Sequence, residues 1–375
     1  MKRAHKIRLK PTKQQEAYLK KAAGTARFAY NWALATWQKQ YEQDLKPTAF
    51  KLKKELNQLK KKEFPWMSEV TKCAPEQALI DLGRAFTNFF RKISKYPKFK
   101  KKGIHDSFYL SNDKFELKDK KVRIPKLGWV KMTEQLRFQG KILSARVSRK
   151  TGYWFIAIQM EIPDPMFPTV KNHDVVGLDF GINTLIMTSE NQAFLAPKPL
   201  KQNLKKLRRL QKSLHRKVKG SNNRYKARQK LSRLYYKIDN IRKDYLHKLT
   251  TKLASTCETL VLEDLNVSGM LRNRRLSRAI SDLGFYELKR QFLYKKQAFG
   301  GGIFIADRWF PSSKTCNNCG TIKEKLSLGN RTFTCADCGY QQDRDLNAAL
   351  NLRTAGSAGS QACGQMYRWD ALVAN

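Results

Sequence analysis

Acidic residues are scarce in this chain of 375 residues: 31 Asp and Glu stand against 75 Lys and Arg, and the formal net charge is +44. Small soluble domains usually carry a net charge of about 2–8, so solubility alone does not account for the excess. Nucleic acid is the natural partner, because each Lys or Arg placed at a phosphate releases a condensed counterion. An anionic membrane surface is the competing interpretation.

Long hydrophobic runs are also missing. No apolar stretch approaches the ~20 residues that a membrane-spanning helix needs, and the opening stretch MKRAHKIRLKPTKQQ lacks the apolar centre of a secretory signal. We therefore expect the seven cysteines to lie in a reducing compartment, where paired CxxC motifs bind metal rather than form disulfides. Hydrophobic residues still make up 41%, which is enough for a sizeable core, and the length suggests two or three domains.

The first hundred residues are expected to contain one strand followed by helices. Residues 4–10 alternate between apolar and polar types, as in a strand. Thr12 followed by Gln15 is a capping-box pattern that starts a helix. Residues 13–97 have helical spacing, with a break expected at Gly24. Lysines crowd their polar faces, which favours a nucleic-acid contact, although a solvated helical bundle is the alternative.

The segment 98–171 favours a small antiparallel barrel. Apolar and polar residues alternate from Trp154 to Ile162, the stretch KILSARVSR before them is also strand-like, and basic turns join the strands. Several short strands of this kind suggest a barrel. The N-terminal strand could belong to it, in which case the helical region is an insertion.

From residue 174 onward, apolar strands alternate with helices, which predicts an α/β core. Residues 191–238 contain 16 Lys or Arg and no acidic residue, and their helical spacing is interrupted by GSNN at 220–223. We interpret this part as a basic helical hairpin long enough to lie along a duplex, although a solvated helix face is possible. After Arg353 the tail is small and polar, and we expect it to be disordered.

Three acidic residues lie where predicted elements end: Asp179 closes VVGLD, Glu263 closes TLVLE, and Asp345 opens DLNAALNLR. Carboxylates at close range repel unless cations hold them, and Mg²⁺ prefers oxygen ligands. We predict that the three share two Mg²⁺ ions, which can activate water and stabilise a leaving 3′ oxygen. Each motif alone is weak. Asp264 should point to the opposite face of its strand, and Asp343 could cap the helix instead.

Four cysteines give the strongest single signal in the chain. A CxxC pair, 15 intervening residues and a second CxxC pair match a closed, structural Zn²⁺ site, whose predicted ligands are Cys316, Cys319, Cys335 and Cys338. The ribbon lies between the last predicted sheet strand and Asp345, so we expect it beside the carboxylates. Arg331, within the ribbon, could contact phosphate there or be an ordinary surface residue.

Several motifs together resemble the TnpB (OrfB) family, the transposon-encoded nucleases of bacterial and archaeal insertion sequences that are related to type V CRISPR effectors. The resemblance runs from about residue 2 to 353 and is strongest in the second half. The motifs that carry it are GLDFG (177–181), LVLEDLNV (260–267), SSKTCNNCG (312–320), CADCGY (335–340) and DRDLNAALNL (343–352), with TARFAYNW (25–32), IPKLGWVKM (124–132) and QGKIL (139–143) upstream.

The resemblance implies an RNA-guided DNA endonuclease with a RuvC-type, RNase H-like core. Such a protein would be cytoplasmic and nucleoid-associated, and a monomer is favoured. A structured guide RNA from the transposon end and target double-stranded DNA would be its partners. The implied domains are a wedge (OB-like) barrel at 1–12 and 98–171, a helical recognition domain at 13–97, a nuclease domain at 172–311 and 341–355 with its basic hairpin at 199–256, a zinc ribbon that binds target nucleic acid at 312–340, and a disordered tail at 356–375.

The resemblance also assigns residues. Asp179, Glu263 and Asp345 match the family's catalytic triad, and the four cysteines match its zinc ribbon. By rough correspondence, Lys72, Ser111 and Asn112 are candidates for reading the short motif beside the target. Three other functions remain open: a nucleic-acid-binding regulator that does not cut, a guide-independent resolvase, and a transposase.

Overall fold

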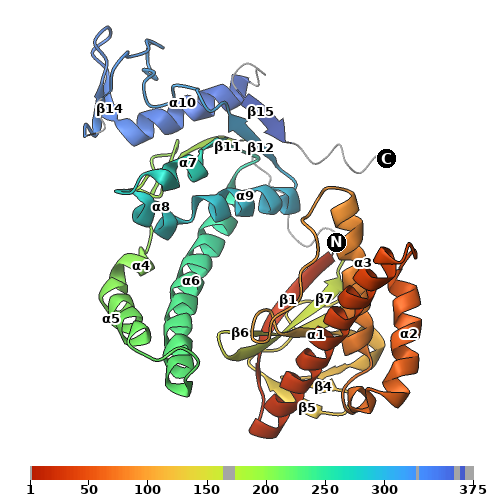
Figure 1. The fold of residues 1–375 in the computed structure, drawn as a ribbon. Helices are drawn as coiled ribbons and strands as arrows, with labels where there is room; N and C mark the ends of the chain where they lie inside the picture. Colours follow the sequence, from red (N-terminus) through yellow and green to blue (C-terminus); the bar gives the residue numbers. More distant parts are fainter. Residues whose placement is uncertain (1, 164–173, 327–328, 359–363, 368–375) are drawn as a thin grey trace. The chain divides into compact units, whose positions relative to one another are not determined.

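The computed structural model describes residues 2–163, 174–326, 329–358 and 364–367. The chain divides into two compact units, Met1–Asp164 and Pro165–Asn375, and each is considered by itself (Figure 1). Within the described ranges, no helix is both long and apolar enough to cross a membrane.

The first unit contains a seven-stranded sheet in which every neighbouring pair is antiparallel. The N-terminal strand pairs with β7 along most of its length and with β5 at Leu9 and Lys10, so it belongs to this sheet, as predicted. Alternation in the sequence buries His5, Ile7 and Leu9 on one face. The strand order is β2 (Ser107–Ser111), β6 (Lys141–Lys150), β7 (Tyr153–Glu161), β1 (Lys2–Lys10), β5 (Gly128–Met132), β4 (Lys121–Ile124) and β3 (Glu116–Lys118).

Helices occupy the predicted insertion between β1 and β2. They are α1 (Lys13–Glu42), α2 (Ala49–Lys62), the 3₁₀ helix η1 (Pro65–Glu69) and α3 (Cys73–Phe90), and a short 3₁₀ helix η2 (Asn112–Lys114) follows β2.

The first helix starts where the sequence predicted. The Gln15 amide donates to Thr12 Oγ1 at 3.2 Å and the Thr12 amide donates to Gln15 Oε1 at 3.0 Å, which completes the capping box. The break expected at Gly24 is wrong, because α1 continues through it. One glycine costs a helix about 1 kcal/mol, and the neighbouring Ala22, Ala23 and Ala26, all buried, favour the helix and pack it.

The second unit is built on a six-stranded mixed sheet. Its order is β10 (Ala193–Phe194), β9 (Ile186–Thr188), β8 (Val175–Asp179), β11 (Thr259–Glu263), β12 (Gly302–Ala306) and β15 (Gly364–Tyr367). The three strands β8, β11 and β12 are parallel, whereas β9, β10 and β15 are antiparallel to their neighbours.

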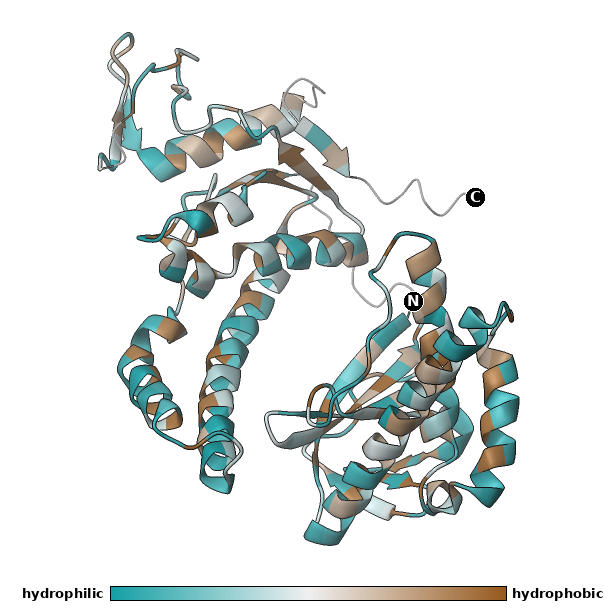
Figure 2. Cartoon of the chain, viewed as in Figure 1, coloured by the Kyte–Doolittle hydropathy of each residue, from teal (hydrophilic) through white to brown (hydrophobic). Residues whose placement is uncertain are grey.

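Both faces of this sheet are covered, which explains why the three central residues of TLVLE are all apolar. Leu260 and Leu262 pack against Leu249 and Phe292 on one face, whereas Val261 packs against Leu352 on the other. Figure 2 shows the central strands as the most hydrophobic part of this unit. The covering helices are α6 (Asn222–Thr256) and α9 (Phe285–Phe299) on the first face and α10 (Arg344–Ala358) on the second.

The predicted basic hairpin is present. It comprises α4 (Pro199–Gln202), α5 (Leu204–His215) and α6, and residues 216–221 separate the last two, so that the second half of GSNN begins α6. Leu207, Leu234 and Ile238 form its small apolar seam. Two short helices, α7 (Val267–Arg272) and α8 (Ser277–Leu283), then lead to α9.

The prediction of a disordered tail is wrong for residues 356–358, which end α10, and for 364–367, which form β15. Small residues serve close packing here. A Cβ atom added to Gly356 would lie 2.3 Å from Cγ2 of Val261, so only glycine lets the helix approach the sheet so closely. Residues 359–363 and 368–375 lie outside the described residues, as do 164–173 of the predicted barrel and nuclease boundary.

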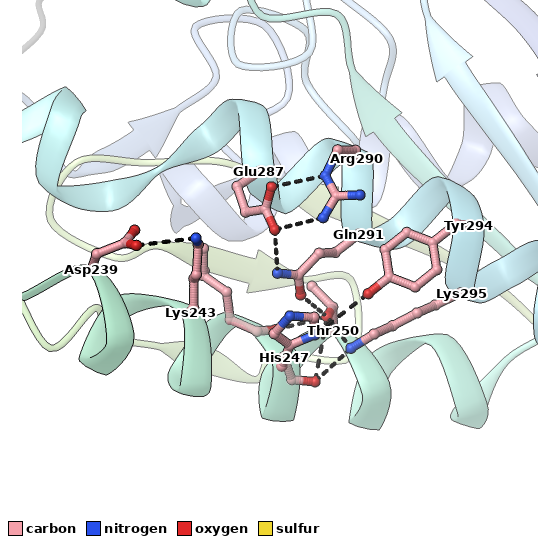
Figure 3. Close-up of polar contacts among 10 residues, drawn as sticks. Asp239, Lys243, His247, Thr250, Glu287, Arg290, Gln291, Tyr294 and Lys295 are labelled. Carbon is pink, nitrogen blue, oxygen red and sulfur yellow. Dashed lines mark hydrogen bonds and ion pairs between the residues drawn. The ribbon is translucent and has the colours of Figure 1, made fainter. Parts of the chain in front are cut away.

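Two lysines are buried between α6 and α9. Lys295 Nζ donates to the carbonyl of His247 at 2.6 Å and to the hydroxyls of Thr250 and Thr251 at 2.8 and 2.7 Å (Figure 3). Lys296 is fully buried. Burial lowers the pKa of Lys295 from 10.5 to about 8 and also lowers the pKa of Lys296. The two helices are therefore joined by polar groups whose protonation is linked to folding.

This linkage predicts a pH-dependent difference between the wild type and Lys295→Met. Unfolding restores the ordinary pKa of Lys295, so the chain takes up a proton on unfolding between about pH 8 and 10.5, and wild-type stability rises with pH in that interval. Between pH 7.5 and pH 10, the free energy of unfolding of the wild type should rise by about 2 kcal/mol more than that of the variant. Urea unfolding at each pH measures the difference. Lys248→Met is the control, because the Lys248 side chain is 76% exposed. If the wild type showed an equal rise relative to this control, the assignment of the pH dependence to buried Lys295 would be contradicted.

Candidate functional site

Sheet register brings two of the predicted carboxylates side by side. Strands β8 and β11 are parallel, and Leu178 is paired with Leu262. The next residues are Asp179 and Glu263, the last of their strands, so both carboxylates lie at the same edge of the sheet. Side chains alternate along a strand, so Asp179 shares a face with Gly177 and Glu263 shares one with Val261. That is the face covered by α10.

The third carboxylate is carried by α10. This helix passes so close to β8 that a Cβ atom on Gly177 would lie 2.1 Å from the carbonyl oxygen of Ala349. Asp345 lies one helical turn before Ala349. A Cβ atom on Gly181, two residues after Asp179, would lie 4.0 Å from Asp345 Oδ2. Asp343 caps the helix, since its Oδ1 accepts from the amides of Asp345 and Leu346 at 2.9 and 3.0 Å. The sequence had left this capping role open, and the geometry confirms it.

Electrostatics agree with this placement. Burial raises the pKa of Asp179 well above its usual range, and the charges of Glu263 and Asp345 raise it further. Burial also raises the pKa of Glu263, with a further contribution from Asp345, while the Ser312 hydroxyl opposes the shift by donating to Glu263 Oε1 at 2.8 Å. Two carboxyl groups whose ionisation is opposed, with a third carboxylate beside them, form a site suited to divalent cations.

Two arginines also reach Asp345. Arg344 Nη2 lies 3.3 Å from Oδ1, and Arg331 Nη1, from the ribbon, lies 3.7 Å from Oδ2. Half of the Arg331 side chain is exposed, so it pairs with the carboxylate and still faces solvent. The sequence singled out Arg331 but gave no signal for Arg344.

Asp264 lies apart from this group, as predicted. Lys289 Nζ lies 2.7 Å from its Oδ1 and Arg308 Nη2 lies 2.5 Å from its Oδ2. Hydrogen bonds from Lys289 and Arg308 lower the pKa of Asp264. The pKa of Glu263 is therefore raised, whereas the pKa of its neighbour Asp264 is lowered. Glu263 belongs to the group of carboxylates, and Asp264 belongs to two salt bridges.

The four cysteines converge, as predicted. Their sulfurs all lie within 4.8 Å of one another, with 3.7 Å between Cys316 and Cys338 and 3.6 Å between Cys319 and Cys335. A tetrahedral Zn²⁺ with Zn–S bonds of about 2.3 Å requires sulfurs about 3.8 Å apart, so the donor set fits the ion. Hydrogen bonds with Thr321 lower the pKa of Cys319 to about 6, whereas burial raises the pKa of Cys316 to about 11. Among the described residues, no three carboxylates gather this tightly.

Cys335→Ser is expected to abolish zinc binding. Structural zinc supplies about 10–16 kcal/mol of folding free energy to small metal domains, and Phe333 with two of the cysteines makes up most of the ribbon's core. The purified wild type should contain one zinc per chain by mass spectrometry, and the variant should lose it and become protease-sensitive between residues 316 and 338. Cys73→Ser, at a cysteine outside the ribbon, should retain zinc. Full zinc content in Cys335→Ser would contradict the assignment.

Two asparagines that the sequence analysis did not single out fix the ribbon to α10. Asn347 and Asn351, one turn apart and both buried, donate to the carbonyl of Thr315 at 2.7 Å. Their side-chain oxygens accept from the backbone and side-chain amides of Asn317 at 3.1 Å. The helix that carries Asp345 thereby also holds the first zinc knuckle. The four-residue spacing of the asparagines in DLNAALN is the signal that could have indicated this role.

The candidates for reading a target motif lie together in the first unit. Cys73 Sγ is 3.5 Å from Ser111 Oγ, which places the start of α3 beside the end of β2. Lys72 precedes α3 and Asn112 opens η2, and both side chains are exposed. Ser111 also donates to Asp113 at 2.5 Å, so it is already engaged within the loop. This arrangement forms one small polar patch.

Comparison with protein families gives three separate matches. Residues 1–46 match a helix-turn-helix domain of the OrfB/IS605 group, residues 157–274 match its probable transposase domain, and residues 285–352 match a Cas12f1-like TNB domain. The last range contains the ribbon cysteines and Asp345, and the second contains Asp179 and Glu263.

Similar proteins span nearly the whole chain. One from Streptomyces pristinaespiralis, named "Putative RNA-guided DNA endonuclease", is 37% identical and covers 98% of this chain and 92% of its own length. InsQ of Escherichia coli K12, of the same description, is also 37% identical and covers 97% and 94%. Among solved structures, Cas12f1 in complex with single guide RNA and target DNA has a TM-score of 0.59 at 15% identity, covering 90% of this chain and 83% of that one.

The fold and these matches define a class, the transposon-encoded proteins that share their architecture with Cas12f effectors. Within this class, the two relatives that are 37% identical over nearly the full length identify the family. The chain belongs to the TnpB (OrfB) family of IS605-type elements.

Proposed function

We propose that this protein is an RNA-guided, Mg²⁺-dependent DNA endonuclease of a bacterial or archaeal insertion sequence, which cuts double-stranded DNA beside a short motif. The observation that carries the proposal is the position of Asp179 and Glu263 at one edge of the sheet, each one residue beyond the paired Leu178 and Leu262, with Asp345 on α10 close enough to influence the pKa of both. The relatives of the same family bear the name of this activity.

The nuclease core is proposed to be RuvC-type and RNase H-like. Three antiparallel strands followed by two parallel ones, β10-β9-β8-β11-β12, support it. Asp179, Glu263 and Asp345 would hold two Mg²⁺ ions, which supply an activated water and stabilise the leaving 3′ oxygen when bound. Ser312 orients Glu263, and Arg344 stays beside Asp345. Arg331, half exposed at the same carboxylate, is suited to a phosphate of the cut strand.

The remaining parts are proposed to bind nucleic acid. The sheet of the first unit would serve as the wedge barrel and its inserted helices as the recognition domain, with Lys72, Ser111 and Asn112 at the flanking motif. The hairpin of α4 to α6 would follow the backbone of the guide–target heteroduplex, because base pairing supplies sequence and the protein supplies charge. The zinc ribbon would hold one Zn²⁺ and contact the target strand. We propose a monomeric protein that acts at the nucleoid in the cytoplasm.

The decisive experiment tests the dependence on RNA. The protein is purified with its copurifying RNA, the RNA is sequenced, and a duplex that matches its variable end is supplied with Mg²⁺. We expect both strands to be cut, and we expect cutting to stop after RNase treatment or addition of EDTA and to resume when the RNA or Mg²⁺ is restored.

Two other outcomes would overturn the proposal in distinguishable ways. Cutting of branched or unmatched duplexes after complete RNA removal would indicate a guide-independent resolvase. Tight binding of the matched duplex without cutting, at saturating Mg²⁺, would indicate a regulator.

A further inference from the structure

An apolar pocket of about 440 Å³ adjoins the carboxylates, and Glu263 is the one residue of its lining that belongs to the proposed metal site. Its wall includes Glu263, and its floor includes Phe180, the residue that follows Asp179. Phe180 and Phe285 stack on one another with ring centroids 6.3 Å apart. The pocket therefore touches the ends of both strands that carry these carboxylates, and its volume falls within the range of small-molecule sites, about 300–1,000 Å³.

One aromatic ring at the pocket is conspicuously exposed. Tyr286, the second residue of α9, lines the pocket with 73% of its surface open to solvent, whereas Phe285 beside it is 2% exposed. Core packing does not explain an exposed ring at the mouth of an apolar pocket. A flat aromatic surface in this position is suited to stacking on another flat ring.

Cations line the rim and distinguish a nucleotide from a purely apolar occupant. Lys289 and Arg308 line the pocket and share a single carboxylate, Asp264, so this pair retains one positive charge. Arg290, also at the pocket, is held by Glu287, with two contacts of 2.8 Å (Figure 3). An apolar floor, an exposed ring and cationic side chains at the rim match a nucleobase with its attached phosphates.

We propose that this pocket binds the base of the nucleotide next to the phosphate being cut, stacked on Tyr286. The inference rests on the proposed nuclease function and extends it. With the base in the pocket, its sugar and phosphate lie along the wall formed by Glu263. The pocket thereby sets which phosphate lies at the carboxylates before hydrolysis. A contact with the backbone charge alone would let the strand slide by one nucleotide, whereas a bound base holds it in place. Tyr286 is a positioning residue and touches no reacting atom.

The test uses the full chain with its guide RNA and a matched duplex. The cut positions are first mapped with end-labelled strands, and 2-aminopurine then replaces the base beside the cut, one strand at a time. In the non-cutting Asp179→Asn background, stacking should quench its fluorescence. The quenching should disappear in Tyr286→Ala and remain in Tyr286→Phe, which keeps the ring. Tyr367→Ala removes another exposed tyrosine, in β15 of the same unit, where no nucleic-acid role is assigned, and it should leave the quenching intact.

A second readout uses the cutting enzyme. An abasic site beside the cut should slow the wild type by roughly 5- to 150-fold, the range expected for one lost base stack, and should slow Tyr286→Ala no further. Equal fluorescence in all variants, or an abasic penalty that persists in full in Tyr286→Ala, would overturn the pocket assignment while guided cutting stands. Loss of guided cutting altogether would instead overturn the proposed function, and the pocket assignment with it.

Discussion

Asp179→Asn is expected to lower the rate of DNA cleavage by about 10³-fold or more and to leave the binding of guide RNA and target unchanged. The substitution keeps the shape of the side chain but removes the charge at the centre of the three carboxylates, where Glu263 and Asp345 already oppose its ionisation. A metal ion supplies several kcal/mol of stabilisation in the transition state, and about 4 kcal/mol corresponds to 10³-fold in rate. Single-turnover cleavage at saturating Mg²⁺ measures the loss.

Asp174→Asn is the matched control for this experiment. Asp174 is exposed and lies just before the other end of the same strand, so the variant makes the same chemical change one strand length away. It should cut at the wild-type rate. Wild-type cleavage by Asp179→Asn would refute the assignment of the site, and parallel loss of cutting and binding would indicate a structural role for the aspartate instead.

Gly177→Ala should disable the enzyme without touching an ionisable group. The added methyl would lie 2.1 Å from the carbonyl oxygen of Ala349 and 2.6 Å from the amide nitrogen of Arg353, both backbone atoms of α10. The helix must move away, and Asp345 moves with it. We expect a loss of about 3 kcal/mol in unfolding free energy and at least about 10²-fold in cleavage, because a shift of 1 Å in a catalytic group has that effect.

The same substitution elsewhere should act in the opposite direction. A Cβ atom on Gly24, inside α1, meets only the end of the Arg27 side chain at 3.7 Å. Gly24→Ala should therefore stabilise the protein by about 0.5–1 kcal/mol, since alanine favours the helix. Chemical denaturation measures both variants. Equal and small effects would show that α10 can slide over the sheet and that Asp345 is not held by this contact.

Local patterns in the sequence predicted most elements of both units. The capping box at Thr12, the alternation before Glu161 and the apolar run before Glu263 each depend on residues close in the chain, so their structures followed from spacing. Zinc spacing was equally local, because each CxxC pair forms its own knuckle. The errors at Gly24 and in the tail have one cause. Both stretches are rich in small residues whose burial against the rest of the fold decided their structure, and the alanines beside Gly24 also favour the helix.

The sequence by itself determined the chemistry of this protein: a strongly basic chain, three acidic motifs and four cysteines at zinc spacing. Only the tertiary structure decided how these parts meet. It paired β8 with β11 in register, and it brought α10 against Gly177 so that Asp345 joined two residues more than 80 positions away. It also placed Ser312, Asn347 and Tyr286 around them. Spacing along a chain fixes local geometry, whereas contacts between distant segments depend on packing that no short motif encodes.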